Sequence, residues 1–310
     1  MSDATSYHVP VLVEEVMEIL RPEAGGLFLD GTVGGGGHAE ALLTRGPEAR
    51  LIGVDRDPDA IAAASRRLER FGDRVRLVSA VYADAVAAAG IAPGSLQGAL
   101  LDLGVSSHQV DEEARGFTFR AGAPLDMRMA AASRGEETAA DLLARLSEEE
   151  LANIFFRYGE ERRARRLART IVEMREREPL TRSEHLVEAI ERSLIRPTAQ
   201  DRARIFQALR IAVNKEIEGL ERALPSLRDA LASGGAFVVL SYHSLEDRLV
   251  KESFREWSRD CVCPPQLPVC VCGGKAMGKL ITRKPIVASR EEVERNPRAR
   301  SVRLRAWRRA

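Results

Sequence analysis

Glycine and acidic residues are concentrated where an apolar segment near the N-terminus ends. The segment 26–30 reads Gly-Leu-Phe-Leu-Asp, and five of the seven residues that follow it are glycines, at positions 31, 34, 35, 36 and 37. Glycine permits sharp turns and a close approach of the backbone to a ligand, and the next helix presents free N–H groups at its start. This combination predicts a cofactor-binding loop rather than a simple turn.

Two kinds of nucleotide cofactor compete for this loop. The Gly-x-Gly-x-x-Ala string at 34–39 has the spacing of a dinucleotide-binding fingerprint, and Asp55 follows about 20 residues later. Asp30 stands directly before the glycines, however, where a carboxylate suits the cationic amino acid end of a ligand better than a pyrophosphate. We therefore favour the acidic-then-glycine loop of Rossmann-like methyltransferases, with Thr32 in place of a usual glycine.

Three further residues follow predicted strands. Asp55 ends the second strand, where its carboxylate would accept hydrogen bonds from both ribose hydroxyls, with capping of the next helix as the alternative. Tyr82 follows the third strand and would either stack on an adenine or pack in the core. Asp102 ends the fourth strand and is expected to point into the ligand crevice of a parallel sheet. No Pro-Pro-aromatic motif follows Asp102, so the residues alone leave the methyl acceptor open.

All four cysteines lie within twelve residues, as two Cys-x-Cys pairs at Cys261, Cys263, Cys270 and Cys272. Four thiolates could hold one zinc ion, although structural zinc sites commonly separate each pair by two to four residues. We favour a reduced loop, kept extended by its prolines, and assign no metal ligand. The clustering also fits a reducing compartment, because secreted disulfide scaffolds spread their cysteines along the chain.

The elements that must position these residues alternate between strands and helices, as in an α/β fold. Strands are predicted at 26–30, 51–55, 74–78, 98–102, 235–241, 280–282 and 301–307, with helices at 10–20, 38–44 and 58–70. Strands this apolar suit a parallel sheet that is covered on both faces. We therefore predict a doubly wound sheet.

Between 137 and 222 the strand signal almost disappears and helical runs replace it, at 147–158, 161–176, 182–193 and 202–224. The strings Ser147-x-x-Glu150 and Thr181-x-x-Glu184 each resemble a capping box at a helix start. These features predict a helical insertion within the sheet domain.

Composition and charge limit the class of protein. Of the 310 residues, 45% are apolar and 30% are charged, which is close to the average for soluble globular proteins. No apolar run approaches the roughly 20 residues of a membrane helix, and the N-terminus lacks a secretory signal pattern. We expect a cytoplasmic protein without a membrane partner. The 47 basic and 46 acidic residues exclude a uniformly basic nucleic-acid coat but allow a local basic patch.

The C-terminal segment is the more basic of two such regions, with eleven Lys or Arg against three acidic residues from Lys279 onward. Basic and apolar residues alternate over 301–307, which predicts a strand with Arg303 and Arg305 on one exposed face. We favour RNA contact by these arginines over charge protection of an edge strand. The alternative RNA-binding face is the arginine-rich helix around 162–169.

Nine strings occur in order along nearly the whole chain: HVPVL (8–12), DGTVGGGGH (30–38), DRDPDAI (55–61), LLDLGVSSHQVD (100–111), RGFTFR…PLDMRM (115–129), YGEER (158–162), RIFQALRIAVNKE (204–216), SYHSLEDR (241–248) and NPRARS (296–301). Together they resemble the MraW/RsmH family of S-adenosylmethionine-dependent enzymes, which methylate N4 of a cytosine in 16S ribosomal RNA. The resemblance implies a class I (Rossmann-like) methyltransferase sheet with an inserted all-helical domain. The expected partner is 16S ribosomal RNA or the small ribosomal subunit.

The resemblance also implies domain limits and site residues. The methyltransferase domain is expected over 1–111 and 216–310, with the basic C-terminus in its second part, and the inserted domain with RNA contacts over 112–215. The residues expected to bind S-adenosylmethionine are Gly36, Gly37, His38, Asp55, Tyr82, Asp102 and Gln109. Because Phe can replace Tyr82 in the family, we expect ring stacking and no role for its hydroxyl.

The weakly nucleophilic cytosine amine needs alignment and a hydrogen-bond acceptor, and Asp102 is the first candidate for that catalytic role. Ser106 and Ser107 could orient the base, Tyr242 could stack on it, and His243 is expected to anchor its loop rather than act in catalysis. The target base must be unpaired or flipped. The rival functions are an NAD-dependent oxidoreductase, disfavoured by Asp30, and a non-catalytic binding protein, disfavoured by the Asp102–Gln109 loop.

Overall fold

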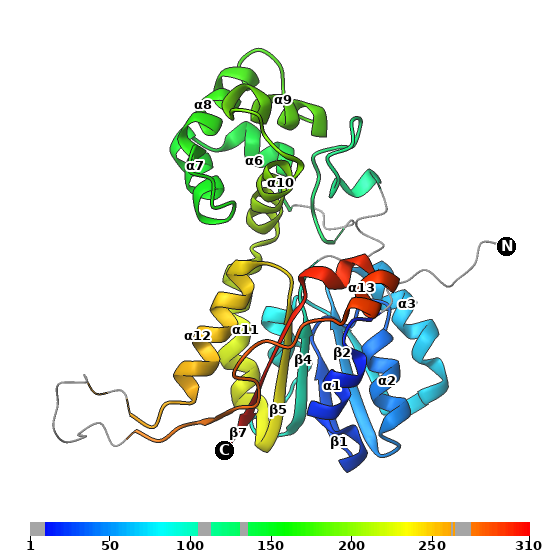
Figure 1. Ribbon diagram of the computed structural model, residues 1–310. Helices are drawn as coiled ribbons and strands as arrows, with labels where there is room; N and C mark the ends of the chain where they lie inside the picture. Colours follow the sequence, from blue (N-terminus) through cyan, green and yellow to red (C-terminus); the bar gives the residue numbers. More distant parts are fainter. Residues whose placement is uncertain (1–9, 105–112, 131–135, 262, 264–273) are drawn as a thin grey trace. The chain divides into compact units, whose positions relative to one another are not determined.

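The chain divides into two compact units in a computed structural model that describes residues 10–104, 113–130, 136–261, 263 and 274–310. One unit, formed by residues 1–104 and 218–310, contains the sheet, and the other, formed by residues 105–217, is helical (Figure 1). We call them the sheet unit and the helical unit. The limits predicted for the inserted domain, 112–215, remain a prediction.

In the described residues the sheet has seven strands in the order β3-β2-β1-β4-β5-β7-β6. Their bounds are β1 (Gly26–Asp30), β2 (Ala49–Asp55), β3 (Val75–Ser79), β4 (Leu96–Asp102), β5 (Leu231–Ser241), β6 (Gly278–Leu280) and β7 (Arg303–Arg309). Strands β1 to β5 pair in parallel, and β7 is antiparallel to both of its neighbours. The predicted class I methyltransferase sheet is therefore confirmed. The order reverses between β1 and β4, and ligands of open α/β sheets bind at the carboxyl ends of the strands at such a point.

Helices cover both faces of this sheet (Figure 1). One face carries α1 (Val13–Leu20), α2 (Gly37–Arg45) and α3 (Pro58–Leu68), and the other carries α4 (Ala85–Ala88), α11 (Glu216–Ala230) and α12 (Ser244–Trp257). Successive strand residues enter opposite cores, so Phe28 packs with the first group of helices and Leu29 with the second. Burial of both faces explains why the strands are nearly continuous apolar runs. The remaining short helices are η1 (Pro22–Ala24), η2 (Glu69–Arg74), η3 (Tyr82–Asp84), α13 (Arg290–Arg295) and η5 (Pro297–Ser301).

The helical unit has a hydrophobic core of its own, with Phe155 and Leu209 among its fully buried residues. Its elements are η4 (Glu113–Arg115), α6 (Ala139–Arg145), α7 (Glu148–Arg157), α8 (Ala164–Arg175), α9 (Ser183–Ser193) and α10 (Ala199–Asn214). The predicted capping box of Ser147 and Glu150 forms at the start of α7. None of the helices in the described residues is both long enough and apolar enough to cross a bilayer.

Two helix boundaries differ from the prediction. The capping box predicted for Thr181 and Glu184 does not form, because α9 is capped at Arg182. The carboxylate of Glu184 instead accepts a hydrogen bond from the Gly122 N–H at 2.7 Å. The single helix predicted over 202–224 is two helices, since Lys215 adopts a left-handed conformation with φ of 51° between α10 and α11. Neither deviation has a local sequence signal such as glycine or proline.

The exposed basic face predicted for the last strand is wrong for one of its two arginines, Arg305. Strand β7 lies inside the sheet, between β5 and β6, and Arg305 is only 8% exposed. Its guanidinium forms two hydrogen bonds with Asp247 of α12, from Nε to Oδ1 at 2.6 Å and from Nη2 to Oδ2 at 3.2 Å. The more exposed Arg303 also binds Asp247, at 3.0 Å. A period-two pattern identifies the two faces of a strand, but it does not show that a helix covers the second one.

Candidate active site

Three aspartates end neighbouring parallel strands at the same edge of the sheet. Asp30, Asp55 and Asp102 are the last residues of β1, β2 and β4. The pKa of Asp30 is raised to about 7, chiefly by burial and also by the negative charges of Asp102 and Asp55, whereas His38 and the Thr32 N–H oppose this rise. Such an accumulation of carboxylates suits a ligand that brings positive charge.

The carboxylate of Asp55 holds the glycine loop. Its Oδ2 accepts a hydrogen bond from the Gly34 N–H at 2.9 Å, and its Oδ1 accepts one from the Asp57 N–H at 2.9 Å. Helix α3 is capped by Asp57, whose side chain accepts from the Asp59 N–H. The capping role considered for Asp55 is thus filled by a neighbour, and a carboxylate, with about four lone-pair sites, could also accept from a ribose hydroxyl.

The glycine loop passes close to α3 and leads into the start of α2. Gly34 and Gly36 have φ of 50° and 80°, and a Cβ at Gly36 would lie 3.4 Å from the Ala64 Cα. Gly37 begins the helix, so its first turn offers N–H groups to a ligand. His38 is 6% exposed, and neither ring nitrogen has a hydrogen-bond partner in the described residues. Buried nitrogens of this kind fit a site that a polar cofactor completes.

Asp102 connects the loop to the end of β5. The Tyr242 hydroxyl donates to Asp102 Oδ1 at 2.8 Å, and the Asp102 N–H donates to Thr32 Oγ1 at 2.6 Å. The other carboxylate oxygen, Oδ2, lies 3.5 Å from His38 Nε2. Burial and the charge of Asp102 raise the pKa of the Tyr242 phenol above its usual range, so this hydroxyl remains a donor. Neither hydrogen bond was predicted from the sequence, although Thr32 in place of glycine was a signal for the second.

His243 fixes the turn that carries Tyr242. It caps α12, where its Nδ1 accepts from the Glu246 N–H at 3.4 Å and its Nε2 lies 3.1 Å from Glu246 Oε1. The second oxygen of Glu246 accepts a hydrogen bond from the Tyr242 N–H at 2.9 Å. These contacts are those of a loop anchor.

Two of the predicted cofactor contacts remain, Tyr82 and Gln109, together with the serines and cysteines named from the sequence. Tyr82 lies in η3 and is half-buried, and its hydroxyl would be 3.3 Å from a Cβ added to Gly219 of α11. Gln109, with Ser106 and Ser107, lies outside the described residues. The same holds for Cys270 and Cys272, whereas Cys261 is exposed and Cys263 is half-buried.

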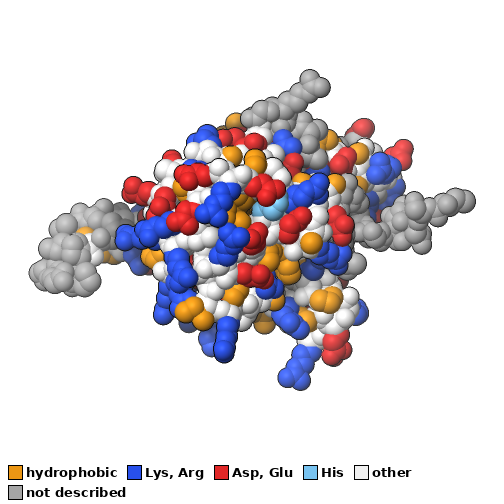
Figure 2. All heavy atoms as spheres, turned by 90° about the horizontal axis from the view of Figure 1, so that it is seen from above, with side chains coloured by type: hydrophobic (Ala, Val, Ile, Leu, Met, Phe, Trp, Pro, Cys, Tyr) orange, Lys and Arg blue, Asp and Glu red, His pale blue; other side chains and the backbone are white. Residues whose placement is uncertain are grey.

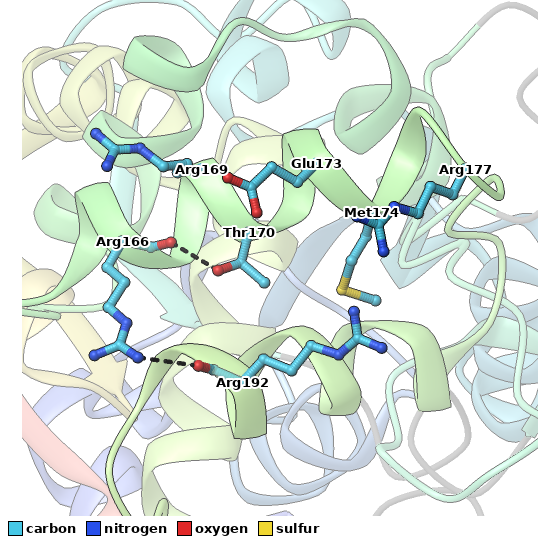
Figure 3. Close-up of a pocket in the computed structure, with 7 residues that line it drawn as sticks. All are labelled: Arg166, Arg169, Thr170, Glu173, Met174, Arg177 and Arg192. Atoms are coloured by element: carbon cyan, nitrogen blue, oxygen red, sulfur yellow. Dashed lines mark hydrogen bonds between the residues drawn. The ribbon is translucent and has the colours of Figure 1, made fainter.

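A second candidate surface is an arginine-lined hollow of about 420 Å³ on the helical unit (Figure 3). Its lining residues come from α8, α9 and the residues after α8: Arg166, Arg169, Thr170, Glu173, Met174, Arg177 and Arg192. Arg169 lies 3.5 Å from Glu148, and Arg192 pairs with Glu188. Within the described part of the chain, Arg166 and Arg177 have no carboxylate partner. Figure 2 shows basic and acidic side chains interspersed on one face of the molecule.

Comparison with known proteins gives matches along the whole chain. The profile of the MraW methylase family matches residues 5–310. The chain is 50% identical over 308 residues to ribosomal RNA small subunit methyltransferase H of Heliobacterium modesticaldum, with 97% of each chain covered. It is 52% identical to the protein of the same name from Gemmatimonas aurantiaca, with 98% of this chain and 96% of that one covered. A solved rRNA methylase from Streptococcus thermophilus is 8% identical with a TM-score of 0.44, covering 97% of this chain and 98% of that one.

Proposed function

The chain belongs to the MraW methylase family, and we propose that it methylates N4 of a cytosine in 16S ribosomal RNA with S-adenosylmethionine as the methyl donor. The observation that carries the proposal is the Asp102–Tyr242 pair beside a glycine loop and two more strand-terminal acids. The relatives act on small-subunit ribosomal RNA by name, and the family resemblance supplies the cytosine amine. A ribosomal RNA substrate also supports a cytoplasmic location for the reaction.

The residues of the site fit this cofactor. S-adenosylmethionine supplies an activated methyl group on a sulfonium when it is bound. Gly36, Gly37 and His38 would hold it at the start of α2, and Asp55 would accept hydrogen bonds from its ribose. Asp30 would face its cationic amino acid end, whereas the family resemblance assigns Tyr82 to the adenine and Gln109 to a further contact.

Asp102 is the group that we assign to the acceptor amine. The lone pair of cytosine N4 is delocalised into the ring, so the amine must be aligned and its hydrogen accepted as the new bond to carbon forms. Tyr242 donates to Asp102 Oδ1 and fixes the plane of the carboxylate, whose oxygens can each accept more than one hydrogen bond and so could also accept the N4 hydrogen. As the nitrogen gains the methyl group, its proton would pass to the Asp102 carboxylate and then to water. Contact with the cofactor is a second role that Asp102 could fill.

The helical unit is assigned to RNA binding. Guanidinium groups pair with phosphate oxygens in a bidentate manner, and Arg166 and Arg177 are available for this in the hollow between α8 and α9 (Figure 3). In the last strand, Arg305 is buried against Asp247 and cannot contribute to this role, whereas Arg303 is 52% exposed.

Mass spectrometry of 16S ribosomal RNA from a deletion strain tests the proposal. We expect N4-methylcytidine to disappear in the deletion strain, to return with the wild-type gene, and to remain absent with Asp102→Asn. Asp73→Asn, an exposed acid outside the site, is the matched control and should restore the modification. In single-turnover assays at saturating cofactor, Asp102→Asn should slow transfer about 100-fold or more. An unchanged methylcytidine content in the deletion strain would refute the assigned reaction.

A further inference from the structure

A smaller hollow of about 180 Å³ on the helical unit is formed by sequence strings that the proposed reaction does not use. Its lining residues include Phe117, Phe119, Met127, Phe206, Gln207 and Arg210. They belong to RGFTFR, PLDMRM and RIFQALR, three of the strings on which the family resemblance depends. The active-site geometry gives none of them a role.

Hydrogen bonds fix the segment 115–129 against α10, so the hollow is preformed. The Asn214 side chain accepts from the Met129 N–H at 2.8 Å and donates to the Met127 carbonyl at 2.7 Å. Arg115 is 5% exposed and donates to the Met129 carbonyl at 2.7 Å. A pocket held in this way loses little conformational entropy when a ligand enters.

The chemistry of the lining combines an aromatic surface with an unused amide. Phe119 is 43% exposed, and its ring meets that of Phe206 edge-on, with centroids 6.1 Å apart and an interplanar angle of 72°. Gln207 is half-buried, and its side chain makes no hydrogen bond in the described part of the chain. Arg210 is held by two hydrogen bonds of 2.9 Å to Glu216, so its charge is already paired.

We infer that this hollow binds one unpaired nucleobase of the RNA substrate, an inference that rests on the proposed function. Unstacked bases are bound on aromatic side chains and by hydrogen bonds to their edges, and an amide offers both a donor and an acceptor for such an edge. A purely apolar peptide side chain would leave the Gln207 amide unused, and a phosphate would find the Arg210 guanidinium already paired. A single base is therefore the occupant that satisfies the whole lining.

The first test compares two probes, a single-stranded RNA of about ten nucleotides and an abasic strand with the same backbone. We expect the wild-type protein to bind the strand with bases at least about fivefold more tightly by fluorescence anisotropy. Phe119→Ala should reduce this ratio about fivefold or more, whereas Phe156→Ala, an aromatic on α7 that is 64% exposed, should preserve it. Phe119→Leu keeps the apolar volume and should resemble Phe119→Ala if stacking is the cause.

A decrease in affinity that is equal for both strands would overturn the inference, because it would indicate phosphate contact or altered folding. An unchanged ratio in both Phe119 variants would overturn it as well.

The second test concerns the amide. Gln207→Leu should reduce the differences in affinity among uridine, cytidine, adenosine and guanosine oligonucleotides, while the preference for bases over the abasic strand remains. Identical base preferences in wild type and Gln207→Leu would exclude edge recognition.

Methyl transfer to small subunits, measured in parallel, separates this inference from the proposed function. If the wild-type protein methylates 16S ribosomal RNA and both oligonucleotide tests are negative, only the nucleobase pocket fails. If the wild-type protein transfers no methyl group, the proposed function fails, and the oligonucleotide tests still decide whether the pocket binds a base.

Discussion

Asp30 is an acid buried at the tip of β1, and its ionised form lowers the stability of the folded protein. Its pKa is raised by burial from 3.8 to about 7. Between these pH values the folded protein binds more protons than the unfolded chain, so the stability of the folded state falls as the pH rises through this window. Asp30→Asn should therefore be more stable than wild type at pH 8, by at most roughly 4 kcal/mol, and the difference should vanish near pH 4.

Urea unfolding without cofactor at pH 5 and pH 8 measures this difference. The same variant should bind S-adenosylmethionine more weakly in calorimetry, because it lacks the charge that faces the cationic end of the cofactor. A stability difference that is equal at both pH values would show that Asp30 does not titrate in this range.

Tyr242→Phe removes the hydroxyl that donates to Asp102 Oδ1 at 2.8 Å and leaves the ring in place. A hydrogen bond to a charged group contributes about 1.5–3 kcal/mol, so we expect single-turnover transfer to slow by about 10- to 100-fold with nearly unchanged cofactor affinity. Tyr82→Phe is the matched control, since only the ring of Tyr82 is expected to matter. Equal rates for Tyr242→Phe and wild type would mean that the hydroxyl does not position the carboxylate.

Residues that end strands were predictable, and the contacts between them were not. Parallel strands present their carboxyl ends at one edge, which made Asp55 and Asp102 candidates from the sequence alone. The bonds of Asp102 to Thr32 and Tyr242 join residues 70 and 140 positions apart, and a local pattern has no means of finding such pairs.

At the level of elements, β7 and α12 are joined by a buried ion pair. Burial tends to raise the pKa of Asp247, but hydrogen bonds from Arg305 and Arg303 outweigh it and hold the pKa below its ordinary value. Arg305→Gln leaves this carboxylate without its buried partner and should destabilise the protein by about 3–5 kcal/mol. Arg303→Gln, at a side chain that is 52% exposed, should cost less than about 1 kcal/mol.

Urea unfolding at neutral pH compares the two variants. Equal costs would mean that the Arg305 pair contributes no more than a surface pair. The alternating pattern over 301–307 predicts the strand correctly, but it does not indicate that α12 covers the face on which the arginines lie. Coverage of a face depends on tertiary packing and is not encoded in the strand itself.

If the hollow between α8 and α9 binds phosphates, its arginines should contribute to the salt dependence of RNA affinity. For every arginine–phosphate pair that is removed, the dependence of RNA affinity on salt concentration decreases by about one unit of slope. Replacing both Arg166 and Arg177 with Gln should therefore flatten the slope by up to about two units and leave the affinity for S-adenosylmethionine unchanged. Arg157→Gln, an exposed residue at the end of α7, serves as the control. A slope equal to that of wild type would place the phosphate contacts outside this hollow.

On the scale of the whole molecule, the chain leaves the sheet after β4 and returns to it at β5, with a separately packed helical unit in between. The loss of strand signal after β4 predicted this interruption, because a change of hydrophobic period is visible in the sequence. The break at Lys215, near the return to the sheet unit, was not visible, since a non-glycine residue in a left-handed conformation has no strong local signal.

If the sheet unit binds the cofactor and the helical unit binds RNA, each ligand should slow hydrogen exchange in a different unit. The described candidate cofactor residues all lie in the sheet unit, so S-adenosylmethionine at about 100 times its Kd should stabilise that unit by about 2.7 kcal/mol. Exchange should slow at Gly34 and Asp57, whose N–H groups bind Asp55, and should not change in α7, α8 and α9. Small subunits from the deletion strain should instead protect α8 and α9, which line the arginine-lined hollow, and the segment 115–129, which lines the smaller hollow. Protection of α8 and α9 by the cofactor alone would contradict this assignment, because it would give the helical unit a direct part in cofactor binding.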